Sequence, residues 1–73
     1  MELDKQLREA LILKYKGEVA AATANIAVYM KQSVGIGEHS DIIGAIDEQL
    51  NLLTASEEKL QAVENHFVPE RVI

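Results

Sequence analysis

The chain contains no cysteine among its 73 residues, which excludes disulfide bonds and metal sites built on thiolates. A chain of about 60 residues buries only about 60% of its unfolded surface, so its fold is marginally stable without further help. Small proteins find that help in disulfides, a bound metal ion or self-association. With disulfides excluded, we expect self-association. A chain without cysteine is also in keeping with a reducing cytoplasm.

Basic residues are few, since 7 Lys and Arg stand against 12 Asp and Glu and give a formal net charge of −5. Binding to phosphate backbones and to anionic lipids depends on Lys and Arg. The balance therefore disfavours nucleic acid and membrane surfaces as partners. A nucleic-acid-binding function would need the basic residues of the first half to cluster, namely Lys5, Arg8, Lys14 and Lys16.

Long apolar runs are also missing. The longest uncharged stretch, residues 19–30, is shorter than the roughly 20 residues that span a bilayer and contains Thr23 and Asn25. Residues 1–4 lack the basic and apolar segments of a signal peptide. We expect a soluble, cytoplasmic protein that does not bind membranes.

Proline and glycine are nearly absent from two long stretches rich in alanine, leucine, lysine and glutamate, which are good helix formers. The pattern predicts one domain with a helix over about 3–31, a turn over 32–40, a helix over about 41–67 and a tail over 68–73. Ser40 is the expected N-cap of the second helix, with Asp41 in its first turn. Pro69 ends that helix, because a helix usually stops before the residue that precedes a proline.

Both predicted helices carry an apolar stripe whose members step by three and four residues. In the first helix the stripe is formed by Ile12, Tyr15, Val19, Ala22, Ile26 and Tyr29. In the second it is formed by Ile42, Ile46, Gln49, Leu53, Ser56, Leu60, Val63 and Phe67, widened by Ile43 and Leu50. Two helices of similar length with a short connection pack antiparallel. The predicted fold is all-α, an antiparallel two-helix hairpin that assembles as a dimer or tetramer into a helical bundle.

The first helix has a second stripe of mostly small residues, which lies away from the first: Leu13, Gly17, Ala20, Ala24 and Ala27. Small side chains let another helix approach closely, so this stripe is the candidate oligomer interface. The alternative is that alanine is here only as a good helix former on a solvated face.

The predicted turn contains Gly35 and Gly37 shortly before the second helix. One interpretation is a backbone nest that holds an anion at a helix N-terminus. Glu38 and Asp41 would repel an anion there, and no complete phosphate-binding motif is present. We favour the simpler interpretation that the two glycines let the chain reverse, and that Ser40 then starts the helix.

The two histidines, His39 and His66, flank the second helix at its opposite ends, about 40 Å apart at 1.5 Å per residue. One chain cannot bring both to one ion, so a metal or ligand site would have to span a subunit interface. Glu57, Glu58 and Glu64 fit a solvated helix face, and no nucleophile and base converge. We expect no cofactor and no enzymatic activity.

Two pairs of polar or aromatic residues have two interpretations each. Tyr15 and Tyr29 are either core-edge residues with hydroxyls in water or anchors for a partner. Asn25 and Gln49 lie beside or within the apolar stripes. They either set the register of the helices or are simply partly exposed.

The segment Val34-Gly35-Ile36-Gly37-Glu38-His39, within a stretch from about Ala20 to Phe67, resembles a family of short uncharacterised proteins of T4-like cyanophages and marine metagenomes. The resemblance implies a small helical viral protein, located in the host cytoplasm, and transfers no catalytic residues. The function that we expect is that of a small oligomeric adaptor or accessory factor with a protein partner. The alternative is a helical bundle that binds a ligand or metal across a subunit interface.

Overall fold

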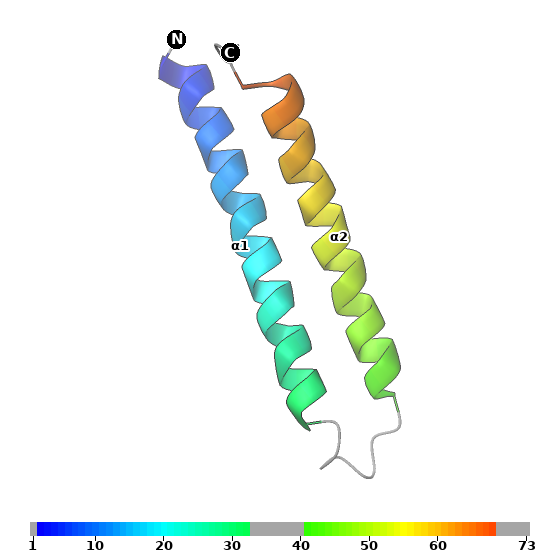
Figure 1. Ribbon diagram of the computed structural model, residues 1–73. Helices are drawn as coiled ribbons and strands as arrows, with labels where there is room; N and C mark the ends of the chain where they lie inside the picture. The colour runs from blue at the N-terminus through cyan, green and yellow to red at the C-terminus, as the bar shows by residue number, and fades with distance from the viewer. Residues whose placement is uncertain (1, 33–40, 69–73) are drawn as a thin grey trace.

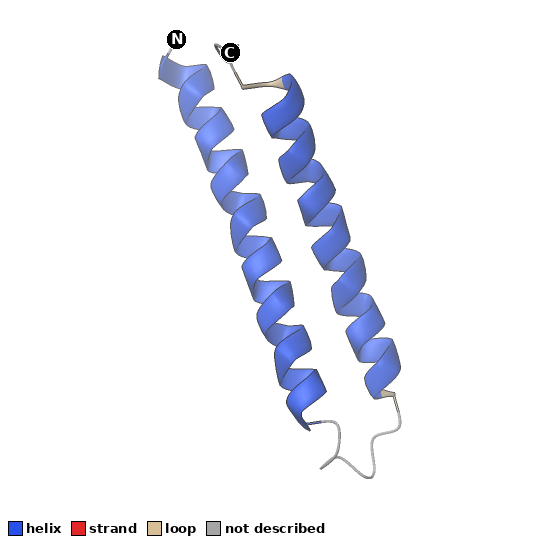
Figure 2. Ribbon diagram, viewed as in Figure 1, coloured by secondary structure: helices blue, strands red, loops and turns tan. Residues whose placement is uncertain are grey.

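The computed structural model describes residues 2–32 and 41–68 of the chain and contains two helices in that part. Helix α1 runs over Glu2–Gln32 and helix α2 over Ile42–His66. At 1.5 Å per residue these helices are about 46 Å and 37 Å long. The all-α prediction is confirmed (Figure 2).

The N-cap of α2 is Asp41, not Ser40 as the sequence predicted. The Asp41 carboxylate accepts a 3.0 Å hydrogen bond from the Gly44 backbone N–H, and the Asp41 carbonyl accepts one of 3.1 Å from Ala45 N–H. Asp and Ser are similarly good caps, so the sequence did not decide between neighbours. Ser40, Gly35 and Gly37, the residues of the predicted turn, lie outside the described residues.

The two helices lie side by side and antiparallel, so that the start of α1 is next to the end of α2 (Figure 1). Three contacts between them show a constant register: Asn25 with Gln49, Glu18 with Ser56, and the Tyr15 ring with the Lys59 ammonium. From one pair to the next, the residue number falls along α1 by as much as it rises along α2. The hairpin is therefore confirmed as an antiparallel pair in one continuous register.

The predicted stripe of α1 faces α2, since all six of its residues are half-buried or buried. The stripe of α2 is confirmed from Ile42 to Val63 but is wrong at three positions, because Phe67, Ile43 and Leu50 are 64%, 78% and 42% exposed. A two-helix contact covers only a narrow seam, and Ile43 and Leu50 lie beyond it. Phe67 is the C-cap, with φ −123° and ψ 0°, and so leaves the helical stripe.

The shared core is small. Among the described residues only Ala22 and Val63 are buried hydrophobic residues, with Ser56 as a buried polar one. The radius of gyration is 16.7 Å, whereas a compact domain of this length would have about 11 Å. The hairpin is a rod, and a rod of two helices exposes much of its apolar surface.

Neither α1 nor α2 combines the length and the apolar character that crossing a membrane requires, a finding that concerns only the described part of the chain.

Candidate functional site

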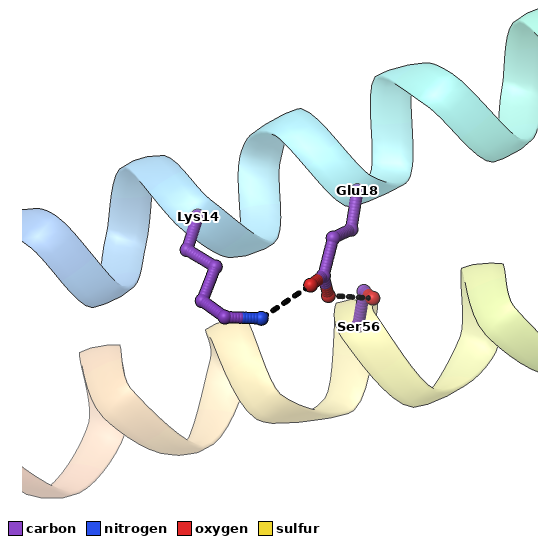
Figure 3. A network of polar contacts seen from close by, with 3 residues as sticks. All are labelled: Lys14, Glu18 and Ser56. Carbon is purple, nitrogen blue, oxygen red and sulfur yellow. Dashed lines mark hydrogen bonds and ion pairs between the residues drawn. The ribbon is translucent and has the colours of Figure 1, made fainter.

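A polar cluster joins the two helices near their middle (Figure 3). The Ser56 hydroxyl of α2 donates a 2.7 Å hydrogen bond to Glu18 Oε1 of α1. The Lys14 ammonium, one turn before Glu18 on α1, donates to the other carboxylate oxygen and forms an ion pair with it. Glu18 thus binds one group on its own helix and one on the partner helix.

The surroundings of Glu18 favour its charged form. The hydrogen bond from Lys14 lowers the pKa of the Glu18 carboxyl below its ordinary value, and the bond from Ser56 lowers this pKa further. The same contact with Glu18 raises the pKa of the Lys14 ammonium. Hydrogen bonds that stabilise the charged form are the physical cause in both cases.

A second polar contact lies on the same side of the hairpin. Asn25 Nδ2 donates a 3.1 Å hydrogen bond to Gln49 Oε1. Glu18 to Asn25 on α1 and Gln49 to Ser56 on α2 each span seven residues. Residues seven apart lie on one face of a helix in coiled-coil-like packing, so both hydrogen bonds lie on one side of the rod.

A groove of about 370 Å³ lies between the helices on this side. Its apolar lining is Ala21, Ala22, Leu52 and Ala55, and its polar lining is Glu18, Asn25, Gln49, Ser56 and Lys59. Small side chains from both helices make the hollow, because alanine and serine leave space where larger residues would fill it. We call the surface over this groove the groove face.

The groove face was not among the predicted sites, and the sequence carries a weak signal for it. The prediction named Asn25 and Gln49 together as residues that could set the register of the helices, but it did not pair Ser56 with Glu18. The seven-residue spacing of polar residues on both helices is the pattern that could have indicated a shared polar side.

The predicted oligomer interface lies elsewhere. Its five residues, Leu13, Gly17, Ala20, Ala24 and Ala27, are all exposed and belong to α1 alone. An added Cβ at Gly17 would meet nothing within 4 Å. We call this surface the small-residue face. It is free for a partner in the single hairpin, and its use as an interface stays a prediction.

The two tyrosines of α1 are half-buried against α2. The Lys14 and Lys59 ammonium groups lie 5.4 and 5.8 Å from the centre of the Tyr15 ring. These distances are within the range of cation–π attraction. They agree with the interpretation of Tyr15 as a core-edge residue rather than a free anchor.

Acidic side chains pair with two of the basic residues in the described part of α1. Arg8 pairs with Asp4 at 3.5 Å, and Lys14 pairs with Glu18. Two of the four residues that a nucleic-acid site would need are thus held by acidic neighbours, which weakens that alternative.

The structure describes only one of the two histidines. His66 is exposed in the last turn of α2, while His39 lies outside the described part. Over residues 2–32 and 41–68 there is no group of three or more His, Cys, Asp or Glu side chains that could hold a metal ion.

No protein-family model, no curated protein and no solved structure matches this chain. The resemblance to short cyanophage proteins therefore stays a hypothesis, and the candidate site is argued from the geometry of the hairpin alone.

Proposed function

We propose that this chain is a small homo-oligomeric structural or interaction protein, which works by presenting helical surface to a protein partner. The observation that carries the proposal is the amount of surface that the single hairpin exposes. Its accessible surface is 5857 Å², whereas a compact monomer of this mass exposes about 4,500 Å². The single hairpin therefore exposes about 1,400 Å² more surface than a compact monomer of the same mass.

The composition of the exposed surface supports the same proposal. Large hydrophobic side chains that are 40% to 78% exposed occur on both helices, namely Leu3, Leu7, Leu11, Leu13, Val28, Met30, Ile43, Leu50, Leu52 and Phe67. A single exposed apolar residue is ordinary, whereas a large exposed apolar surface on a monomer marks an interaction site. By comparison, only two hydrophobic residues are buried in the described part of the chain.

The mass of the protein in solution tests the proposal. Sedimentation velocity and light scattering at micromolar concentration should give a multiple of the 8.1 kDa chain mass, with helical circular dichroism. A stable, folded monomer over the same concentration range contradicts the proposal, since the hairpin would then need no partner copy.

A further inference from the structure

The groove face carries both a hollow and a side chain of the right kind to fill such a hollow. Ala22 and Ser56, at its floor, are 2% and 4% exposed. Leu52, at its edge, is 55% exposed. A hollow and an exposed apolar side chain on one surface can fit each other in two copies, and the interface of a two-fold symmetric dimer requires such self-complementarity.

We propose that a second copy of this chain packs on the groove face, so that the four helices of the two copies form one bundle. Leu52 of each copy then fills the hollow of the other. This inference rests on the proposed function. It places the interface between the two copies on the groove face rather than on the small-residue face.

Apolar residues continue the groove face along the rod. Seven-residue steps from Ala21 reach Val28, which is 50% exposed, in one direction, and Lys14 and then Leu7, which is 58% exposed, in the other. Residues at this spacing share a face. The groove face therefore offers apolar residues from both helices at the groove and further apolar residues of α1 beyond it, interrupted by Lys14. The small-residue face offers residues of α1 alone.

The area also fits a second copy. A standard protein–protein interface buries about 800 Å² from each partner. The hairpin exposes about 1,400 Å² more than a compact monomer of its mass, so one such interface fits within this excess. A small molecule is a poorer occupant, because ligand pockets enclose about 70–90% of the ligand surface, and this groove is only partly enclosed.

The charges on the groove face are compatible with a second copy of the chain. Glu18 and Lys59 carry opposite charges and both line the groove. A second copy carries the same two groups, so Glu18 of one copy can meet Lys59 of the other. Complementary charge on an interface fixes register and disfavours wrong pairings.

Two neighbouring alanines of α1 give a matched test. Ala21 lines the groove and Ala20 belongs to the small-residue face, and both are exposed in the single hairpin. Ala21→Glu would place an additional charge and a larger side chain in the proposed interface, so we expect the dissociation constant of the dimer to rise at least about tenfold. Ala20→Glu is a surface change and should stay within about twofold of the parent protein. Sedimentation velocity over a concentration series measures both.

The outcomes separate this inference from the proposed function. A parent protein that is monomeric throughout overturns both. A parent oligomer that Ala20→Glu disrupts and Ala21→Glu does not, or that both disrupt equally, overturns the inference and leaves the proposed function standing. Disruption by Ala21→Glu alone supports the inference.

Thiol labelling keeps the test decisive where a charged variant fails to fold. The chain has no cysteine of its own, so Ala21→Cys and Ala20→Cys each introduce one small reporter. We expect the maleimide labelling rate of Ala21→Cys to fall as the protein concentration rises through the dissociation constant, while that of Ala20→Cys does not change. Equal behaviour of the two variants overturns the inference.

Discussion

The Ser56 hydroxyl donates a 2.7 Å hydrogen bond to Glu18 Oε1 across the two helices. Ser56 is 4% exposed and comes from α2, whereas Glu18 is half-buried and comes from α1. Glu18 also binds the Lys14 ammonium. One carboxylate therefore links a contact within a helix to the contact between helices, and its titration reports on the packing of the hairpin.

The first prediction concerns the pKa of Glu18. Lys14→Gln should raise this pKa more than Ser56→Ala does, because the hydrogen bond from Lys14 is the largest cause of its lowering. Carbon-detected NMR titration of the side-chain carboxyl measures both variants against the parent protein. A larger rise in Ser56→Ala would contradict the assignment of causes.

The second prediction is the dependence of stability on pH. The pKa of Glu18 is lowered in the folded state, so its contribution is present at pH values above the ordinary Glu pKa. That contribution is lost as the pH falls through the folded-state pKa. Urea unfolding of Glu18→Gln and the parent protein should therefore differ most near neutral pH and converge in acid. A difference that persists unchanged in acid argues against the linkage.

The Lys14 partner gives the opposite sign in alkali. Its pKa is raised above the ordinary value of 10.5 in the folded state. Its contribution is complete below that ordinary value and is lost as the pH rises through the folded-state pKa. Between the ordinary pKa of Glu and the ordinary Lys pKa of 10.5, the contribution of the Lys14–Glu18 ion pair to stability does not change with pH.

The third prediction compares two glycines in helices. Gly17→Ala should stabilise by about 0.5–1 kcal/mol, because an added Cβ meets nothing within 4 Å and alanine is the better helix former. Gly44→Ala gains a similar amount. It also places the Cβ 2.5 Å from the Asp41 carboxylate oxygens, so the cap must move and about 1 kcal/mol is lost. The net effect at Gly44 should be close to zero.

A double variant isolates the cap. When Asp41→Ala has already removed the capping carboxylate, Gly44→Ala should stabilise by about 1 kcal/mol. Thermal unfolding at one fixed protein concentration measures all four proteins, since association shifts the apparent stability. The same small effect of Gly44→Ala in both backgrounds would show that the cap is unimportant.

The fourth prediction concerns the buried seam. Val63 is 8% exposed, and Val63→Ala should cost roughly 1–2 kcal/mol through lost apolar burial, after the gain in helix propensity. Ile43 is 78% exposed, so Ile43→Ala is the matched control and should be nearly neutral. An equal loss in both variants would indicate that Ile43 is covered in solution by another chain.

The fifth prediction concerns Asn25 and Gln49, which form a 3.1 Å hydrogen bond. Replacing both with leucine should raise the thermal midpoint and weaken the preference for one register, because polar pairs in helical assemblies set register at a cost in stability. Hydrogen exchange should then show less uniform protection along the two helices. A less stable double variant with unchanged protection would argue for a purely stabilising contact.

Much of the fold followed from local properties of the sequence. Long stretches of helix formers without proline, together with apolar residues at three- and four-residue steps, were enough to predict both helices and their facing stripes. The predicted bounds differ from the observed ones by one residue at each end. Local signals suffice here because helix formation depends on residues close in sequence, and a short connection makes two successive helices pack antiparallel.

Tertiary structure decided which residues within those stripes are covered and which polar groups meet. Ile43 and Leu50 carry the expected pattern, yet a single partner helix is too narrow to cover them. Phe67 also carries it, but as the C-cap it leaves the helical stripe. The pairing of Ser56 with Glu18 depends on the register of α1 against α2, which no local pattern encodes. The groove face exists for the same reason, because its alanines come from two helices and form a hollow only when the helices lie side by side.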